Sequence, residues 1–387
     1  MMNTEQNTFQ VGPIRPPSEA NSLLLQITEN CSWNKCKFCM IYKGQQFRTR
    51  PVETIKKDID VMARYRDMIS KHMSGTTYDE ASLNKEFASL PNYDAKMCYQ
   101  MVFNWLTQGG SQAIFLQDAN TIVLRPEWLV EILEHIMENF PELERVTSYG
   151  RADALARISP SDFKKIADAG LNRIHSGYES GSDDVLKLID KGVTQEQEII
   201  GGRKVKDAGI ELSIYFMPGV GGKALTHENA SKTAKVINEV NPDFVRLRTF
   251  VLRTGSPMDE LKRSVQYEEC TDMEKLLEIR ELLTNIDSTK VDGKIASDHI
   301  INLLQDIEGY LDKDTTKLIK YIDSFLALPR RDQKIYQLAR RRGFPMDWTH
   351  LKHMREGDLQ EIKNIVDATA DGPKWEQLLH EYLDRYI

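Results

Sequence analysis

Three cysteines lie within nine residues near the start of the chain, as Cys31, Cys36 and Cys39. They are three of only five cysteines in 387 residues, and their spacing is C-x4-C-x2-C. Such clustering indicates a metal site rather than a disulfide framework. The apolar run at residues 23–28 predicts a buried strand directly before them, so we expect the cysteines on the loop that leaves this strand.

The number of ligands in this loop bears on the identity of the metal. A closed structural zinc site usually takes four ligands in two separated pairs, but Cys98 is distant and no histidine follows at the spacing of a zinc finger. Three thiolates also suit an iron–sulfur cluster, where they would leave one iron of a four-iron cluster open. We therefore favour a [4Fe–4S] cluster over a zinc ion or inert cysteines.

Strands and helices that alternate along the chain must position this loop. Strand-like apolar runs and helical periodicity alternate between residues 12 and 260, which predicts a parallel sheet. The pattern alone fits both an open (β/α) barrel and a doubly wound sheet. Residues 1–11 are expected to form a flexible tail, and residues 261–387 a helical C-terminal extension. The six predicted strands are 23–28, 113–116, 146–149, 173–178, 212–217 and 244–250.

One long segment interrupts this alternation. Residues 67–94 contain Gly75 and Pro91, show no clear periodicity, and separate the helix expected at 52–66 from that expected at 95–107. An irregular connection of this length is uncommon in a compact domain and is often functional. We interpret it as an insertion that is either a plain surface loop or a lid over the open end of the fold.

In parallel α/β folds, ligands bind at the carboxyl ends of the strands. Polar side chains recur at this end of the predicted strands, which packing alone explains poorly. A Gly-rich turn at 218–222 follows the fifth strand and would permit close approach of a ligand to the backbone. The candidates from the second to the sixth strand are Gln117, Asp118, Asn120, Ser148, Arg151, Glu179, Ser180, Met217, Arg246 and Arg248.

The cysteine loop, in which Phe38 stands directly before Cys39, resembles that of the radical S-adenosylmethionine (SAM) enzymes. The usual spacing in that family is C-x3-C-x2-C, so this chain has one extra residue between Cys31 and Cys36. Further segments are similar to a subgroup related to oxygen-independent coproporphyrinogen III oxidase and the Elongator catalytic subunit. These segments lie at residues 14–20, 115–120 and 177–182 and, more weakly, at 297–302.

The resemblance implies a fold and a reaction. The fold is an open six-unit (β/α) partial TIM barrel over residues 12–260, followed by the helical extension. In the reaction, a [4Fe–4S] cluster reduced by a flavodoxin- or ferredoxin-type donor cleaves SAM. The 5′-deoxyadenosyl radical so formed abstracts hydrogen from a substrate that the sequence does not identify. The alternative is a non-catalytic iron–sulfur and SAM-binding protein, such as a haem or cofactor chaperone.

The resemblance also implies a SAM site. The family carries an ammonium-binding Gly-Gly-Glu motif after strand two, where Asp118 is the local substitute, and Glu179 corresponds to a polar residue that contacts the ribose or amino end. Glu179 could instead stabilise the helix that follows it. Arg151 and Arg248 compete for the SAM carboxylate, with Arg203 as a third candidate. The full expected set is Phe38, Tyr42, Gln117, Asp118, Asn120, Ser148, Arg151, Glu179, Ser180, Met217 and Arg248.

Other residues that could carry chemistry have simpler interpretations. His299 matches a family pattern and could reach the substrate, but no other catalytic residue is assigned. His175 is expected to be a satisfied interior histidine, and Cys98 and Cys270 to be ordinary small apolar residues. The basic cluster at 330–342 could meet an RNA backbone, but a solvated helix face is the favoured interpretation.

Composition limits the class of protein. The net charge is −7 and hydrophobic residues make up 41% of the chain, which is typical of a soluble globular protein and does not favour a general polyanion binder. No apolar run approaches the roughly 20 residues of a membrane span, and residues 1–10 lack the apolar core of a signal peptide. We expect a cytoplasmic protein, in which thiols stay reduced.

Overall fold

The computed structural model describes residues 9–108 and 112–384, which divide into two compact units. The first unit comprises Met1–Asn34, Ile41–Ser176 and Ile200–Leu212. The second comprises Lys35–Met40, Gly177–Ile199 and Ser213–Ile387. Three elements have residues in both units, namely β8 (Leu171–Glu179), α8 (Gln195–Asp207) and β9 (Glu211–Phe216).

Parallel strands in the order β1-β6-β7-β8 form the centre of the first unit. In this register Leu23 lies opposite Ile114, and Ile114 lies opposite Val146. Every residue of β1 and β6 is buried, as expected of parallel strands that are covered on both faces. The first three predicted strands are confirmed as β1 (Leu23–Gln26), β6 (Ala113–Gln117) and β7 (Arg145–Tyr149).

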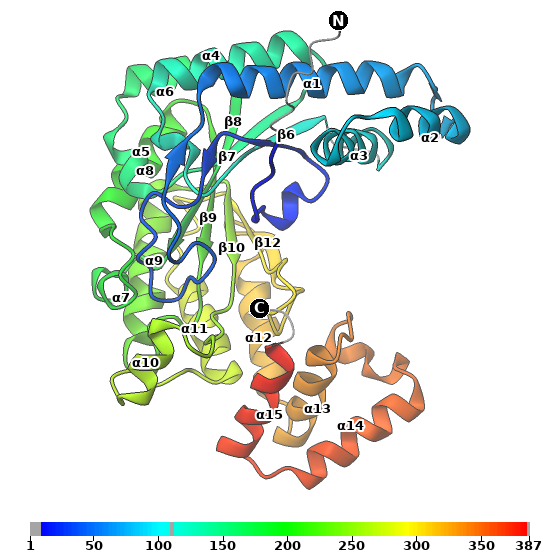
Figure 1. Cartoon of the computed structure of the whole chain (residues 1–387). Coiled ribbons are helices and arrows are strands. Elements are labelled where there is room, and N and C mark those ends of the chain that lie inside the picture. The colour runs from blue at the N-terminus through cyan, green and yellow to red at the C-terminus, as the bar shows by residue number, and fades with distance from the viewer. Residues whose placement is uncertain (1–8, 109–111, 385–387) are drawn as a thin grey trace, which may run out of the picture. The chain divides into compact units, whose positions relative to one another are not determined.

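Amphipathic helices cover these strands. Helix α4 (Pro126–Asn139) buries Leu129, Ile132, Leu133 and Ile136, which recur at helical spacing along one face. Figure 1 shows α1 (Val52–Ser70) beside α4, and the two helices pack together. The remaining elements here are α3 (Tyr93–Thr107), α5 (Ala152–Arg157), α6 (Pro160–Asp168), the 3-10 turns η1 (Pro17–Glu19) and η2 (Thr121–Val123), and the short strands β2 (Thr28–Glu29) and β3 (Arg48–Thr49).

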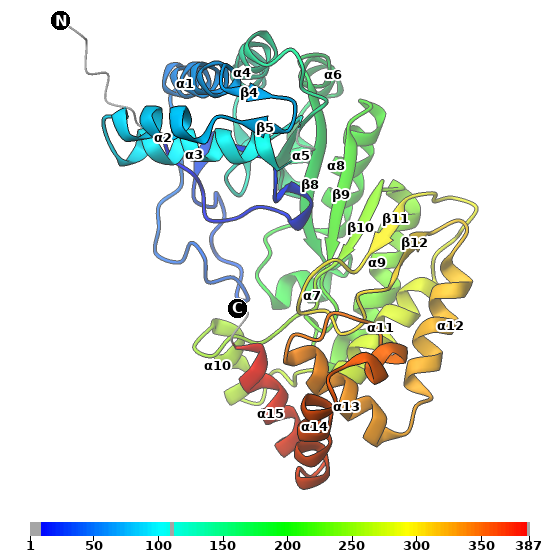
Figure 2. The ribbon, with the colours of Figure 1, turned by 90° about the vertical axis from the view of Figure 1, so that its right-hand side faces the viewer.

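The segment at 67–94 is ordered, which corrects the prediction of an irregular connection. After α1, a hairpin leads into a further helix that packs beside α3 (Figure 2). Ring contacts join Tyr78 to Phe103 and Phe87 to Tyr99. Elements this short leave no period long enough to detect in the sequence. They are β4 (Met73–Ser74), β5 (Thr77–Tyr78) and α2 (Glu80–Ser89).

In the second unit the strand order is β9-β10-β11-β12. Strands β9, β10 (Phe244–Leu247) and β11 (Lys294–Ala296) are parallel, whereas β12 (Glu308–Tyr310) is antiparallel to β11. The last three predicted strands are confirmed as β8, β9 and β10. The prediction that only helices follow residue 260 is wrong, because β11 and β12 lie there; three residues each are too few to show a strand period.

Helices of the second unit pack around apolar side chains. One buried cluster includes Val185, Met217, Phe250 and Tyr267, and Phe38 of the cysteine loop packs against it. Helix α13 packs on both α14 and α15, drawn in orange to red in Figure 1. The helices are α7 (Asp183–Leu188), α9 (Thr226–Val240), α10 (Pro257–Arg263), α11 (Asp272–Thr284), α12 (Thr315–Leu326), α13 (Arg330–Arg341), α14 (Glu356–Ala368) and α15 (Pro373–Leu383), with η3 (Lys223–Leu225) and η4 (Trp348–His353).

Over the described parts of the chain, no helix combines the length and the apolar character that crossing a membrane would require.

Candidate functional site

The division between the two units falls within the cysteine loop. Cys31 belongs to the first unit, and Cys36 and Cys39 belong to the second. None of the three forms a disulfide; Cys36 is buried and the other two are half-buried. Asn34 N–H donates to Cys31 Sγ (3.4 Å), and Cys39 N–H donates to the Cys36 carbonyl (3.3 Å). Within residues 9–108 and 112–384, no three His, Cys, Asp or Glu side chains are arranged as a metal site, so the ligand set stays a prediction.

Asp118 lies directly after β6 and is 1% exposed. The Tyr42 hydroxyl donates to Oδ1, while Oδ2 has no hydrogen-bond partner among the described residues. A Cβ on Gly12 would lie 3.0 Å from the carboxyl carbon, so the segment before β1 passes close over this group. Burial raises the pKa of Asp118 to about 6, although hydrogen bonds from Tyr42 and from backbone N–H groups oppose the shift. The carboxyl group therefore has one oxygen available to accept from a cationic ligand.

Gln117, a predicted SAM-site residue, forms hydrogen bonds with the segment that leads into β1. Its Nε2 donates to the carbonyls of Gly12 (3.1 Å) and Ile14 (2.8 Å), and its Oε1 accepts from Gly12 N–H (2.9 Å). Both amide hydrogens are thus used to hold the segment that leads into β1. The assignment of Gln117 to the SAM site stays a prediction, and these hydrogen bonds give it no support. The sequence could not show that residues more than 100 positions earlier would contact this side chain.

Asn120 and Arg151 connect the first-unit part of the cysteine loop to the carboxyl end of β7. Asn120 donates to Ser32 Oγ (2.9 Å) and accepts from Arg151 N–H (3.0 Å). The Arg151 guanidinium lies 5.5 Å from the centre of the Trp33 ring, and its Nε donates to Asp153 (3.1 Å). The structure therefore brings both predicted residues against the loop, with Arg151 already paired to a carboxylate.

Glu179 and Lys191 form a buried ion pair beside the second-unit part of the loop. Lys191 Nζ lies 2.9 Å from Glu179 Oε1, and the two side chains are only 8% and 10% exposed. The same ammonium lies 5.7 Å from the centre of the Phe38 ring. Lys37 N–H also donates to the Ile189 carbonyl (2.8 Å), which ties the loop to the segment before Lys191. Lys191 is thus a positively charged neighbour of both Phe38 and Glu179.

Lys191 is a site residue that the sequence reasoning missed. It follows α7 rather than a strand, so a search limited to strand ends overlooks it. Arg151 is likewise paired, with Asp153, and Arg203 is exposed on α8. Because Lys191 lies beside Phe38 of the cysteine loop, it joins the arginines as a candidate partner for a ligand carboxylate.

Three other predicted residues contribute little polar surface. The buried Ser148 hydroxyl donates to the Tyr149 carbonyl (3.0 Å), and the buried Ser180 hydroxyl accepts from Ser182 N–H (3.0 Å). Met217 is 5% exposed and lies in the apolar cluster against which Phe38 packs. These residues lie at the ends of β7, β8 and β9, and the two serine hydroxyls form hydrogen bonds with the backbone.

Arg248 and His299 follow the ends of β10 and β11. Asn302 holds the loop after β11 against β10, because it donates to the Leu247 carbonyl (2.8 Å) and accepts from Thr249 N–H (2.9 Å). Burial and the positive charge of Arg248 lower the pKa of His299 to about 4, so the imidazole is neutral at neutral pH. Contact of His299 with a substrate stays a prediction. Arg246, the other arginine candidate from β10, forms an ion pair with Asp298.

His175 is an interior histidine, as predicted, and one of its ring nitrogens has a carboxylate partner. It is fully buried, and its Nε2 lies 3.2 Å from Glu19 Oε1. The Ser22 hydroxyl donates to the other oxygen of Glu19 (2.6 Å). Although burial alone would raise the pKa of Glu19, hydrogen bonds from His175 and Ser22 and the nearby charges of His175 and Arg145 lower it to about 2.

The basic cluster at 330–342 is a solvated face only in part, which corrects the favoured interpretation: Arg331 and Arg342 are exposed, but other members are not. Lys334, Arg340 and Arg341 are buried in the second unit. Arg341 forms an ion pair with Asp272 of α11 (2.9 Å), and Lys334 donates to the Thr369 carbonyl (2.7 Å). Their charges are used inside the protein, where carboxylates and helix-end carbonyls compensate them.

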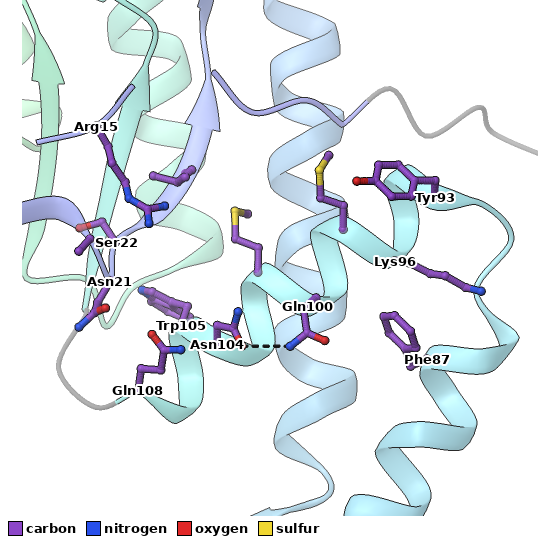
Figure 3. Close-up of a pocket in the computed structure, with 14 residues that line it drawn as sticks. Arg15, Asn21, Ser22, Phe87, Tyr93, Lys96, Gln100, Asn104, Trp105 and Gln108 are labelled. Carbon is purple, nitrogen blue, oxygen red and sulfur yellow. Dashed lines mark hydrogen bonds between the residues drawn. The ribbon is translucent and has the colours of Figure 1, made fainter. Parts of the chain in front are cut away.

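A cavity of about 600 Å³ lies apart from these residues, between α2, α3 and the start of β1 (Figure 3). Phe87, Tyr93 and Trp105 line it together with Ser22 and Leu24. None of its lining residues belongs to the predicted SAM site. Because Ser22 and Leu24 mark the amino end of β1, the 67–94 segment reaches this end of the strand rather than its carboxyl end. The lid hypothesis stays a prediction, and this placement gives it no support.

Comparison with known proteins identifies relatives of the whole central region. The model of the family described as "Radical SAM superfamily" matches residues 25–230. A tRNA-2-methylthio-N(6)-dimethylallyladenosine synthase of Desulforamulus reducens is 24% identical over 205 residues, which cover 44% of this chain and 45% of that protein. The chain therefore spans about half the length of this curated relative.

Solved structures also resemble the chain. The archaeal Elp3 of Methanocaldococcus infernus, with residues 1–46 deleted, is similar over 60% of this chain and 59% of that chain, with a TM-score of 0.42 and 17% sequence identity. Coproporphyrinogen III oxidase (HemN) of Escherichia coli is similar over 68% of this chain and 51% of that chain, with a TM-score of 0.43 and 14% sequence identity.

Proposed function

Because the chain belongs to the radical SAM superfamily, we propose that it cleaves SAM reductively and abstracts hydrogen from a substrate. The cofactors of this family are a [4Fe–4S] cluster and SAM, which together supply a 5′-deoxyadenosyl radical. The protein contributes binding, orientation and the exclusion of water. The observation that carries the proposal is the family match over residues 25–230, which contains all three clustered cysteines.

We assign the cluster to Cys31, Cys36 and Cys39. None of the three forms a disulfide, and Cys31 and Cys39 are only half-buried. Soft thiolate ligands suit iron–sulfur clusters, and three of them would leave one iron open. The other two cysteines are fully buried and lie far from this loop in the sequence.

Within the same proposal, charged side chains bind the two ends of the amino acid part of SAM. The unpartnered Oδ2 of Asp118 would accept from the ammonium group. Lys191 or Arg248 would donate to the carboxylate, and Glu179 would accept from the amino end or the ribose. Charge-assisted hydrogen bonds of this kind are stronger than neutral ones and fix orientation.

The substrate and the electron donor are further parts of the proposal. A one-electron donor of the flavodoxin or ferredoxin type would reduce the cluster. The matched curated relatives include enzymes named for tRNA modification, so tRNA is the first substrate class to test. The basic residues at 330–342 do not argue for RNA, because several of them are buried and paired inside the second unit.

The test is reconstitution without oxygen, followed by addition of SAM and dithionite and detection of 5′-deoxyadenosine by mass spectrometry. We expect 5′-deoxyadenosine from the wild type and none from Cys36→Ala. Addition of total tRNA should raise the yield if RNA is the substrate. A cluster whose electron paramagnetic resonance spectrum changes with SAM but which never yields 5′-deoxyadenosine would favour the non-catalytic chaperone alternative.

A further inference from the structure

The cavity of about 600 Å³ in the first unit extends along α3 at the amino end of β1 (Figure 3). Ligand sites usually have volumes of roughly 300–1,000 Å³. The candidate SAM site lies at the opposite, carboxyl ends of the strands, so this cavity is a separate feature. Among the described residues that line it, none is Asp or Glu. Its composition therefore suits a ligand that carries negative charge.

Two basic side chains supply positive charge to this cavity. Arg15 comes from the segment before β1 and is exposed, and Lys96 comes from α3 and is half-buried. In the part of the chain that the structure describes, neither forms an ion pair with a carboxylate. Guanidinium and ammonium groups bind phosphate well, and these two have no carboxylate to displace first.

Aromatic rings accompany the positive charge. Tyr93, the first residue of α3, is 77% exposed, whereas Tyr310, the next most exposed aromatic side chain in the described residues, is 50% exposed. Phe87 of α2 is half-buried, and the Lys96 ammonium lies 5.7 Å from the centre of its ring. Because most of the Tyr93 ring is uncovered, a planar group such as a nucleobase can stack on it.

Side-chain amides line the cavity away from these rings. Gln100 and Asn104 lie on α3, Gln108 directly follows this helix, and Asn21 precedes β1. Such amides both donate and accept, so they can pair with the edges of bases and with the 2′-hydroxyl of ribose. Helix α3 has 15 residues and is therefore about 22 Å long, several times the roughly 3.4 Å between stacked nucleotides. A cavity lined from Tyr93 to Gln108 thus suits a strand better than one free nucleotide.

We propose that this cavity binds an unpaired stretch of RNA, whose bases stack on Tyr93 and Phe87 and whose phosphates contact Arg15 and Lys96. Exposed rings beside basic side chains are the combination that proteins use to bind single strands. The amides would contact base edges and ribose hydroxyls, which makes RNA the preferred strand. The inference does not depend on SAM cleavage, because no lining residue belongs to the predicted SAM site.

The first test measures fluorescence anisotropy of a labelled oligouridine decamer titrated with the anaerobically reconstituted full chain. Tyr93→Ala should bind the decamer about tenfold more weakly than the wild type, because a base loses its stacking partner. Since the Tyr93 ring is largely exposed, the variant should keep the iron content and melting temperature of the wild type. Tyr310→Ala removes an exposed ring of the second unit and is the matched control, with unchanged RNA affinity.

The second test measures the salt dependence of the same binding from about 50 to 200 mM salt. The logarithm of the binding constant should fall linearly with the logarithm of the salt concentration, with a slope of about −0.7 for each phosphate contact. Arg15→Gln and Lys96→Gln should each make the slope shallower by about 0.7. Lys85→Gln is the charge-matched control, because Lys85 is exposed on α2 outside the cavity, and it should keep the wild-type slope.

Several outcomes would overturn this inference. A wild type that does not bind the decamer would leave the cavity to a protein or a small molecule. Unchanged affinity in both Tyr93→Ala and Arg15→Gln would place RNA elsewhere on the chain. Competition by UMP at the concentration of the decamer would indicate a free nucleotide, and equal affinity for an oligodeoxyuridine decamer would rule out a preference for RNA.

These outcomes are distinguishable from failure of the proposed function. The variants leave the SAM site intact, so SAM cleavage to 5′-deoxyadenosine without RNA should equal that of the wild type. RNA binding by a wild type that never cleaves SAM would overturn the proposed function and leave this inference standing.

Discussion

The two cysteines outside the loop at 31–39 are held as thiols by burial. Burial raises the thiol pKa of Cys98 well above its usual range and that of Cys270 to about 12, so both stay protonated at neutral pH. Cys31 and Cys39 are half-buried, and Cys36 is buried next to them in the sequence. Since the thiolate is the form that binds metal, burial marks Cys98 and Cys270 as packing residues.

The first prediction follows from this difference. Cys31→Ala, Cys36→Ala or Cys39→Ala should each abolish loading of close to four irons per chain, because a three-ligand site cannot spare one thiolate. Iron and sulfide are measured after anaerobic reconstitution. Cys98→Ala is the matched control and should load normally. Full iron content in a variant lacking all three clustered cysteines would refute the assignment.

The second prediction concerns the pH dependence of SAM binding. Burial raises the pKa of Asp118 to about 6, with the Tyr42 hydrogen bond opposing the shift. An ammonium group binds the ionised carboxylate, so affinity should be constant above pH 6 and fall by up to about tenfold per pH unit below it. Titrations from pH 5 to 7.5 would show this bend.

Two variants test the origin of that bend. Asp118→Asn should bind SAM weakly, with no bend, because it cannot ionise. Tyr42→Phe removes the hydroxyl that donates to the carboxylate, so the bend should move to higher pH. A wild-type profile that is flat across this range would remove Asp118 from the ammonium site.

At the scale of elements, the helices and the hairpin between α1 and β6 form a packed layer. Leu83 of α2 is buried, and Phe87 contacts Tyr99 of α3. The Tyr99 hydroxyl donates to Glu86 (3.1 Å), and His72 contacts the other oxygen of Glu86 (3.0 Å). These contacts tie the segment to α1 and α3, which themselves cover β1.

The third prediction is that deletion of residues 73–89, bridged by Gly and Ser, lowers the thermal stability of the protein. The deletion uncovers the aromatic face of α3, where each large apolar side chain is worth about 1.5–3 kcal/mol on burial. Thermal unfolding and the ratio of 5′-deoxyadenosine to product are the two measurements. An unchanged melting temperature with increased uncoupled SAM cleavage would instead establish the lid.

At the scale of the whole chain, the C-terminal helices connect to the region that holds the 218–222 turn. Arg341 of α13 pairs with Asp272 at the start of α11, and the two side chains are 2% and 6% exposed. Burial would raise the pKa of Asp272, but the charges of Arg341 and Lys275 and hydrogen bonds from Gln337 and Arg341 lower it overall. Asp272 is therefore ionised and depends on its partner.

The fourth prediction is that Arg341→Met lowers the free energy of unfolding by about 3–5 kcal/mol, because it leaves a buried carboxylate unpaired. Urea unfolding monitored by circular dichroism measures the effect. Arg331→Met is the control, since its pair with Asp367 is about half exposed, and should cost about 0–1 kcal/mol. Equal effects of the two variants would contradict the structural assignment of the buried pair.

The sequence alone predicted the longer strands and helices, whose periodicity extends over several residues. It also predicted the function of the cysteine motif, which depends on local spacing. All six strands of the alternating region are present, and the family suggested by the loop at 31–39 is confirmed by the match over residues 25–230. Strand and helix periods are set by local backbone geometry, so they are recorded in neighbouring residues. Strands of three residues, and a hairpin of two-residue strands, are too short to show a period. The sequence therefore did not predict β11, β12 or the secondary structure of the 67–94 segment.

Tertiary structure decided which polar side chains remain available for a ligand. Gln117 donates to the carbonyls of Gly12 and Ile14, whereas Oδ2 of the adjacent Asp118 has no hydrogen-bond partner in the described part of the chain. Lys191 pairs with Glu179, 12 residues earlier, and Lys334, Arg340 and Arg341 of α13 are buried. The sequence does not distinguish these cases. Hydrogen bonds between distant segments form only when the chain packs, and each buried polar group must then find a partner.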